Sequence, residues 1–356
     1  MNNPYENPFD EGRDEFTFYD DIAYKDAKRT VSRTCLGTAL FSAVPYALIL
    51  VLSLILVAIM GELAYTELVS NPYFNVGVSY GIMYLVGIPL LLLCIRGLPK
   101  RRLHDASSLS GGELIAMIPL AQFFMTAGAN VGNVIDSIFV VLSGSETENP
   151  VESMASDMPI WLFALVTVVI APIAEELIFR KLLFDRLSIH GNVFAIIFTS
   201  VLFGLIHGNF YQLFYAAFLG LLLGYVRVKG GSWLYAVGLH AFVNLFNGLI
   251  PTLLDGFTDG FEAALEALIS GNAEVFAENI HAFMIFGSYI ILQSLLSLAG
   301  TVIFIVALVK RKIHLKNAPE CPLPHGRLPA VIFKSAGAII LLAVSTLIIF
   351  INYIPQ

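Results

Sequence analysis

The sequence predicts an all-α polytopic membrane protein, a bundle of about nine transmembrane helices with a polar cavity inside the membrane. Of the 356 residues, 57% are hydrophobic and only 13% are charged, whereas about 25% charged residues are usual in a soluble domain. The apolar segments run for about 17–30 residues and lack the two-residue alternation of a transmembrane barrel. These observations exclude a soluble protein and favour membrane-spanning helices.

Nine apolar segments fit this pattern. They cover residues 36–60, 77–96, 114–143, 158–179, 192–207, 210–227, 232–254, 282–309 and 331–353. Residues 1–34 hold eight acidic and five basic residues and few apolar ones, so we expect a disordered acidic cytoplasmic tail. The remaining residues, 35–356, would form a single transmembrane domain.

Lysine and arginine alternate between the loops in a way that predicts an orientation. The loops at 61–76, 144–157 and 255–281 contain neither residue, whereas the tail and the other polar loops are basic. Because positive residues mark the cytoplasmic side, we expect the N terminus inside and the C terminus outside a plasma membrane. Residues 255–280 then form an acidic extracytoplasmic segment, and their apolar residues have the spacing of an amphipathic helix.

Two adjacent glutamates, Glu175 and Glu176, end an apolar segment. Each charge near a bilayer centre costs about 2.5–3.5 kcal/mol on insertion scales, so both need a partner, water or a chemical role. Glu176 precedes Arg180 by four residues, which predicts an ion pair on one helix face. Glu175 is rotated by about 100° from Glu176 and would face a cavity. A structural ion-pair cluster of all three residues at the cytoplasmic interface fits the same spacing.

Two later segments carry polar residues of the same kind. His207 lies at the tip of a predicted hairpin of two short apolar segments, and this tip, with Asn209, would lie within the membrane. His240 and Asn244 are four residues apart, on one helix face near the middle of their segment. Taken singly, each feature also fits hydrogen bonding between packed helices.

Together, these side chains supply the groups that hydrolysis by water requires. Glu175 would accept the proton of the water, and His207 would orient the water or relay that proton. His240 and Asn244 would stabilise the oxyanion of a tetrahedral intermediate. Alternatively, His207, His240 and Glu175 would bind Zn²⁺ or another divalent metal with an open water position. The sequence has no suitably placed cysteine nucleophile.

Three motifs carry a family resemblance: Glu-Glu-x-x-x-Arg at 175–180, Phe-x-x-x-His at 203–207 and His-x-x-x-Asn at 240–244. In this order they resemble the CPBP family of type II CAAX prenyl endopeptidases and bacteriocin-processing and self-immunity proteins, also called Abi proteins. The resemblance covers residues 158–250, the CPBP-like catalytic core. It implies an intramembrane metalloprotease, although a metal-free, glutamate-activated water has also been proposed for this family. The residues it marks as catalytic are Glu175, His207, His240 and Asn244, with Glu176 and Arg180 supporting them.

We therefore expect an intramembrane endopeptidase acting on a membrane-associated peptide or small membrane protein, with the lipid bilayer as a second partner and no nucleic acid. The alternative is a non-catalytic membrane scaffold, or an immunity or peptide-binding protein. A proton-coupled transporter is a third class, but no inverted repeat is found. On the segment 114–143, Asn130, Asn133 and Ser137 share a face and would either line the cavity or form hydrogen bonds between helices.

Overall fold

The computed structural model describes residues 15–101, 109–144, 149–311, 313, 315, 319–321, 323, 326–351 and 353, with side chains from residue 21 onward. All regular secondary structure in these residues is helical. Seven helices are long and apolar enough to cross a membrane, and two apolar helices are shorter. The predicted fold class, an all-α polytopic membrane protein, is therefore confirmed.

The helices follow one another along the chain. The first part of the chain forms α1 (Glu15–Met60), α2 (Glu62–Val69), α3 (Pro72–Ile95), α4 (Gly111–Ser143) and α5 (Pro150–Ser156). A helical stretch then continues through α6 (Ile160–Ala164), η1 (Leu165–Ile170), α7 (Ala171–Glu176), η2 (Leu177–Leu183), α8 (Phe184–Leu187) and η3 (Ser188–His190). After it come the hairpin helices α9 (Asn192–Leu205) and α10 (Phe210–Gly230).

The rest of the chain has the same all-helical character. It comprises α11 (Leu234–Asn244), η4 (Leu245–Leu249), α12 (Ile250–Leu254), η5 (Asp255–Phe257), α13 (Thr258–Ser270), α14 (Ala273–Glu278), α15 (Ile280–Val309), α16 (Leu328–Phe333) and α17 (Ala336–Ile351). The segments η1, η2 and η4 are π-helices. In a π-helix each backbone N–H donates to the carbonyl five residues earlier, instead of four residues earlier as in an α-helix.

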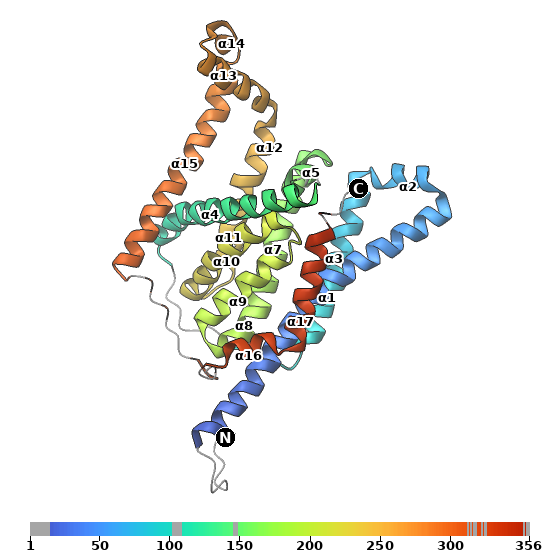
Figure 1. Cartoon of the computed structure of the whole chain (residues 1–356), viewed down its shortest axis with the longest axis vertical. Helices are drawn as coiled ribbons and strands as arrows, with labels where there is room; N and C mark the ends of the chain where they lie inside the picture. The colour runs from blue at the N-terminus through green and yellow to red at the C-terminus, as the bar shows by residue number, and fades with distance from the viewer. Residues whose placement is uncertain are drawn as a thin grey trace.

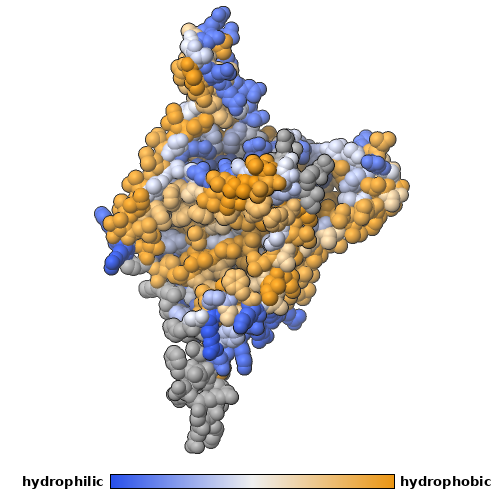
Figure 2. All heavy atoms as spheres, in the orientation of Figure 1, coloured by the Kyte–Doolittle hydropathy of each residue, from blue (hydrophilic) through white to orange (hydrophobic). Residues whose placement is uncertain are grey.

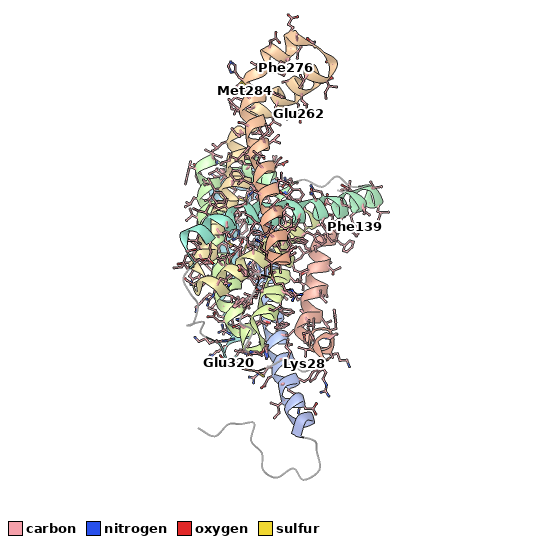
Figure 3. All side chains as sticks on the ribbon, turned by 90° about the vertical axis from the view of Figure 1, so that its left-hand side faces the viewer. Lys28, Phe139, Glu262, Phe276, Met284 and Glu320 are labelled. Carbon is pink, nitrogen blue, oxygen red and sulfur yellow. The ribbon has the colours of Figure 1, made fainter. Side chains whose placement is uncertain are left out.

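The helices form a bundle with an arm at one end. In Figure 1, α7, α9 and α10 lie between α1 and α17 on one side and α15 on the other, and α12 to α15 extend beyond the bundle. Figure 2 shows a broad hydrophobic belt between hydrophilic ends. In Figure 3, Glu262 and Phe276 lie on the arm, whereas Lys28 and Glu320 lie at the opposite end. This distribution is that of a multi-pass membrane protein.

The hairpin of α9 and α10 is packed so closely that a glycine is required. A Cβ atom on Gly204 would lie 2.4 Å from the backbone oxygen of Leu213. Small residues allow helices in membranes to approach in this way. On the other face of α9, Leu202 and Phe203 pack into the main buried cluster with Phe179 and Leu183 of η2. The hairpin is thereby fixed against the helix that carries the glutamates.

The expected disordered tail at 1–34 is wrong for residues 15–34, which belong to α1; residues 1–14 lie outside the described part of the chain. Ala23, Ala27 and Val31 recur every four residues and are buried. This apolar stripe packs against α16, where Val331 joins the same cluster. The prediction relied on average composition, and the stripe is hidden among the charged residues that surround it.

Two further expectations need correction. The segment 331–353 is not one helix, because the chain breaks between α16 and α17 at residues 334–335. The face of α4 that carries Asn130, Asn133 and Ser137 is exposed, and none of these residues lines the cavity described below. The acidic segment 255–280 is helical as predicted, in η5, α13 and α14.

Candidate active site

A cavity of about 510 Å³ opens among the helices of the bundle, and four predicted residues line it. Glu175 comes from α7, His207 from the turn after α9, and His240 and Asn244 from α11. The structure therefore brings together, in one place, side chains that are up to 69 positions apart in the sequence (244 − 175). The two predicted supporting residues, Glu176 and Arg180, are fully buried behind the cavity wall.

A proline sets the local geometry of the helix that carries Glu175. In the π-helix η1, the Ala171 N–H donates to the Val166 carbonyl, five residues earlier. The next residue, Pro172, has no N–H, so the Thr167 carbonyl has no donor in this register. The Asn244 side chain takes that place, because its Nδ2 donates to Thr167 O at 2.8 Å. Asn244 thereby links α11 to the turn that precedes the glutamates.

Glu176 is the centre of a buried charge network. Its Oε2 lies 3.1 Å from Arg180 Nε, which is the predicted ion pair, and its Oε1 accepts a hydrogen bond from His240 Nδ1 at 2.9 Å. The second contact was not predicted, since sequence spacing along one helix does not show what another helix brings near. Arg180 also donates to the Gly220 carbonyl and lies 4.9 Å from the centre of the Phe203 ring.

The other nitrogen of His240 points toward Glu175. His240 Nε2 lies 3.7 Å from Glu175 Oε2, which is beyond a direct hydrogen bond. Because Nδ1 donates to Glu176, the ring orientation and the role of each nitrogen are fixed. The side chain of Glu175 is 15% exposed, whereas that of Glu176 is fully buried. Only the first of the two carboxylates is accessible to water from the cavity.

His207 is also held in one tautomer. Its Nδ1 donates to the Phe203 carbonyl at 2.8 Å, so Nε2 is left as an acceptor. The Phe203 ring contacts both imidazoles edge-on, with centroid distances of 5.1 Å to His207 and 5.6 Å to His240. The predicted hairpin-tip residue Asn209 does not line the cavity; its side chain accepts from the Gln212 N–H and caps α10.

A second buried ion pair supports the helix beyond Arg180. Arg227 on α10 lies 2.8 Å from Asp185, and its Nε donates to the Arg180 carbonyl at 3.0 Å. Both side chains of this pair are 3% exposed. The π-helix η2, between the two ion pairs, is therefore fixed from α10. No role was predicted for Arg227 or Asp185, because each lies in a basic stretch that fits a solvated loop.

The outer wall of the cavity comes from helices that precede the predicted catalytic core. Tyr80, Met83 and Tyr84 of α3 and Tyr46 of α1 line it, and Met154 of α5 accepts a hydrogen bond from the Tyr80 hydroxyl. Sequence reasoning missed these residues, since tyrosine and methionine in an apolar segment also fit plain packing. The only available signal was the four-residue spacing of Tyr80 and Tyr84 on one helix face.

The predicted metal site of His207, His240 and Glu175 stays a prediction. Within the parts of the chain that the structure describes, no group of three or more His, Cys, Asp or Glu side chains is arranged to hold a metal ion. His240 Nδ1 is engaged with Glu176, which leaves Nε2 as its only free nitrogen. Glu175 and His240 approach each other to 3.7 Å, and His207 lines the same cavity.

Comparisons with known proteins agree with the motifs. The family model described as type II CAAX prenyl endopeptidase Rce1-like matches residues 157–246. "Putative membrane peptidase YdiL" of Bacillus subtilis is 26% identical over 168 residues, which cover 46% of this chain and 68% of the relative. The UPF0177 protein YxdF of Lactococcus lactis is 30% identical over 118 residues, which cover 33% of this chain and 66% of the relative. No solved structure matches.

These matches confirm the family resemblance that the three motifs predict. The matched residues 157–246 include both glutamates, both histidines and Asn244. They do not include α1 and α3, which contribute to the cavity wall, or α15, whose Gln293 donates to the lining residue Asn247.

Proposed function

We propose that this protein is an intramembrane endopeptidase that hydrolyses a peptide bond of a membrane-associated peptide or small membrane protein. The observation that supports it most is the convergence of Glu175, His207 and His240 on one cavity, with both imidazoles held in defined tautomers. The match to the CAAX prenyl endopeptidase family model supports the same reaction class. The aromatic and methionine side chains of α1, α3 and α5 suit an apolar peptide segment.

In the proposed reaction, a water bound to Glu175 inside the cavity attacks the substrate carbonyl carbon. Glu175 accepts one proton of that water, and His207 Nε2 accepts a hydrogen bond from it and fixes its direction. The carbonyl oxygen becomes an oxyanion, which the free N–H of Asn244 would stabilise, as would His240 if its ring carried a proton on Nε2 as well as on Nδ1. The proton then passes from Glu175 to the leaving nitrogen as the carbon–nitrogen bond breaks, which yields a carboxylic acid and an amine.

The position of Asn244 in the sequence predicts a role in stabilising the oxyanion, whereas its main role in this proposal is to hold the helix of Glu175. Its Nδ2 already donates to the Thr167 carbonyl, so one of its two N–H bonds is used to hold the helix of Glu175. We assign Asn244 as a positioning residue for Glu175, and only its second N–H can reach an oxyanion in the cavity.

A metal is not used in any step of this proposal. His207, His240 and Glu175 would be its ligands, and a bound Zn²⁺ would lower the pKa of a water molecule. We propose the metal-free route, in which Glu175 activates the water as a general base. We also propose a plasma-membrane location with the N terminus in the cytoplasm, because the basic loops lie at the N-terminal end of α1 and the acidic arm lies at the other end.

The test is cleavage of defined peptides by the purified full chain in proteoliposomes. A mixture of apolar decapeptides serves as substrate, and mass spectrometry identifies the cut sites. His207→Ala and His240→Ala should each reduce the rate by at least about 100-fold, whereas His281→Ala, an exposed residue on α15, should leave it unchanged. Equal rates in all three variants would refute the proposal and favour a scaffold or peptide-binding protein.

A further inference from the structure

The π-helix η4 begins directly after Asn244 and repeats the backbone arrangement of η1. The Ile250 N–H donates to the Leu245 carbonyl, five residues earlier. The following residue is Pro251, which has no N–H. The Phe246 carbonyl therefore has no donor in the π-helical register, just as the Thr167 carbonyl has none before Pro172. A buried carbonyl of this kind requires another donor.

Tyr289 of α15 supplies that donor. Its hydroxyl donates to Phe246 O at 2.9 Å, and the two rings pack with their centroids 5.7 Å apart. Tyr289 is 9% exposed and Phe246 is 7% exposed, so water does not readily replace this contact. The contact joins α15 to η4, the segment that continues α11. Helix α15 lies outside the residues that match the family model.

Gln293, one turn further along α15, extends the contact to a residue of the cavity. Its Nε2 donates to Asn247 Oδ1 at 3.2 Å and also to the Tyr289 hydroxyl. Asn247 lines the cavity, and its Nδ2 donates to the Val243 carbonyl at 3.2 Å. Because its oxygen is held by Gln293, the carboxamide of Asn247 keeps one orientation. The second N–H of Nδ2 is then available to a polar group inside the cavity.

We propose that Tyr289 and Gln293 are positioning residues of the active site, which act through η4 on Asn244 and Asn247. This inference rests on the proposed function. One unpaired carbonyl, that of Thr167, is satisfied by Asn244 and fixes the helix of Glu175. The other, that of Phe246, is satisfied by Tyr289 and fixes the turn that follows Asn244. The two contacts form a chain from α15 through η4 and η1 to α7.

Hydrogen exchange of the purified full chain tests the structural part of the inference without any substrate. Tyr289→Phe removes one hydroxyl and keeps the packed ring. We expect amide exchange at residues 245–250 to become faster by roughly 3- to 10-fold, the effect of one lost hydrogen bond. Tyr73→Phe is the matched control, since Tyr73 is 55% exposed, and it should not change exchange at 245–250. Unchanged exchange there in Tyr289→Phe would overturn the inference.

A double-mutant cycle on kcat tests the functional part. The substrate is a quenched fluorescent peptide that carries a cut site mapped with the decapeptide mixture. Gln293→Leu should lower kcat by roughly 3- to 10-fold in the otherwise unchanged protein, with KM altered less than about twofold. In an Asn247→Ala background the same substitution should have almost no further effect, because its target is gone.

The outcomes separate this inference from the proposed function. An equal loss of kcat from Gln293→Leu in both backgrounds, or no loss in either, would overturn the positioning role. Ser294→Ala, at an exposed neighbouring position on α15, should leave kcat unchanged in both. If the unsubstituted protein cuts none of the peptides, the proposed function fails and the positioning role falls with it. In that case the exchange measurement still decides whether α15 holds η4.

Discussion

Glu176→Gln is the substitution whose effect follows most directly from the geometry. The glutamine side chain has nearly the same shape, and its oxygen can still accept the hydrogen bond from His240 Nδ1. It has no charge, so Arg180 loses its carboxylate partner at 3.1 Å. The guanidinium would then retain the Gly220 carbonyl and the face of the Phe203 ring as direct contacts, with Glu175 as a more distant charge.

The magnitude follows from burial. Both side chains of the Glu176–Arg180 pair are 0% exposed, so neither charge can recover its hydration. Removal of one partner from a buried pair typically costs about 3–5 kcal/mol, whereas replacement of both partners by uncharged groups is often close to neutral. We therefore expect Glu176→Gln to lower the free energy of unfolding by about 3–5 kcal/mol. The double variant Glu176→Gln/Arg180→Met should recover at least half of that loss.

The assay is unfolding in mixed micelles by titration with sodium dodecyl sulfate, followed by the fluorescence of the two tryptophans, Trp161 and Trp233. Glu67→Gln, which removes an exposed carboxylate on α2, is the matched control and should change the unfolding free energy by less than about 0.5 kcal/mol. A loss below about 1 kcal/mol in Glu176→Gln would refute the reasoning. A double variant less stable than Glu176→Gln would do the same.

Three other predictions follow from the structure. Gly204→Ala should lower the free energy of unfolding by about 1–3 kcal/mol, since the new Cβ would meet the Leu213 carbonyl at 2.4 Å; Gly81→Ala, where nothing lies within 4 Å, should cause no loss in the same titration. Asn244→Leu should leave the Thr167 carbonyl without its donor and destabilise the protein by about 1–3 kcal/mol. The cleavage rate should fall by more than the loss of folded protein explains. A stable and active variant would count against the assigned role. Removal of metals with a chelator, checked by elemental analysis, should leave the cleavage rate within twofold, and a loss that added Zn²⁺ restores would establish the metal route instead.

The fold class was predictable because membrane-spanning helices leave a strong signal in composition and length. Of the nine predicted segments, the one at 192–207 is confirmed within two residues as α9. The beginning of α1 was not predictable in the same way. Its charged residues dominate the composition of residues 15–34, while the three buried residues that anchor it, Ala23, Ala27 and Val31, are small and widely spaced.

The candidate site was predictable as a set of residue types and only partly as a geometry. Helical spacing gave the Glu176–Arg180 pair, because both residues lie on one helix. The contact of Glu176 with His240 joins two helices, and no spacing rule reaches from one helix to another. The role of Tyr289 depends on the carbonyl that Pro251 leaves free, which requires the π-helical register to be known. Such a register is set by packing and not by local sequence.

The most direct test of the central claim is the cleavage rate of Glu175→Gln relative to that of Glu67→Gln, at equal amounts of folded protein in proteoliposomes. Glutamine keeps the size of the side chain and cannot accept the proton of the attacking water. We predict a rate at least about 100-fold lower for Glu175→Gln, as expected for the loss of a general base, and an unchanged rate for Glu67→Gln. A Glu175→Gln protein that cuts the same bonds within about threefold of the original rate would contradict the account.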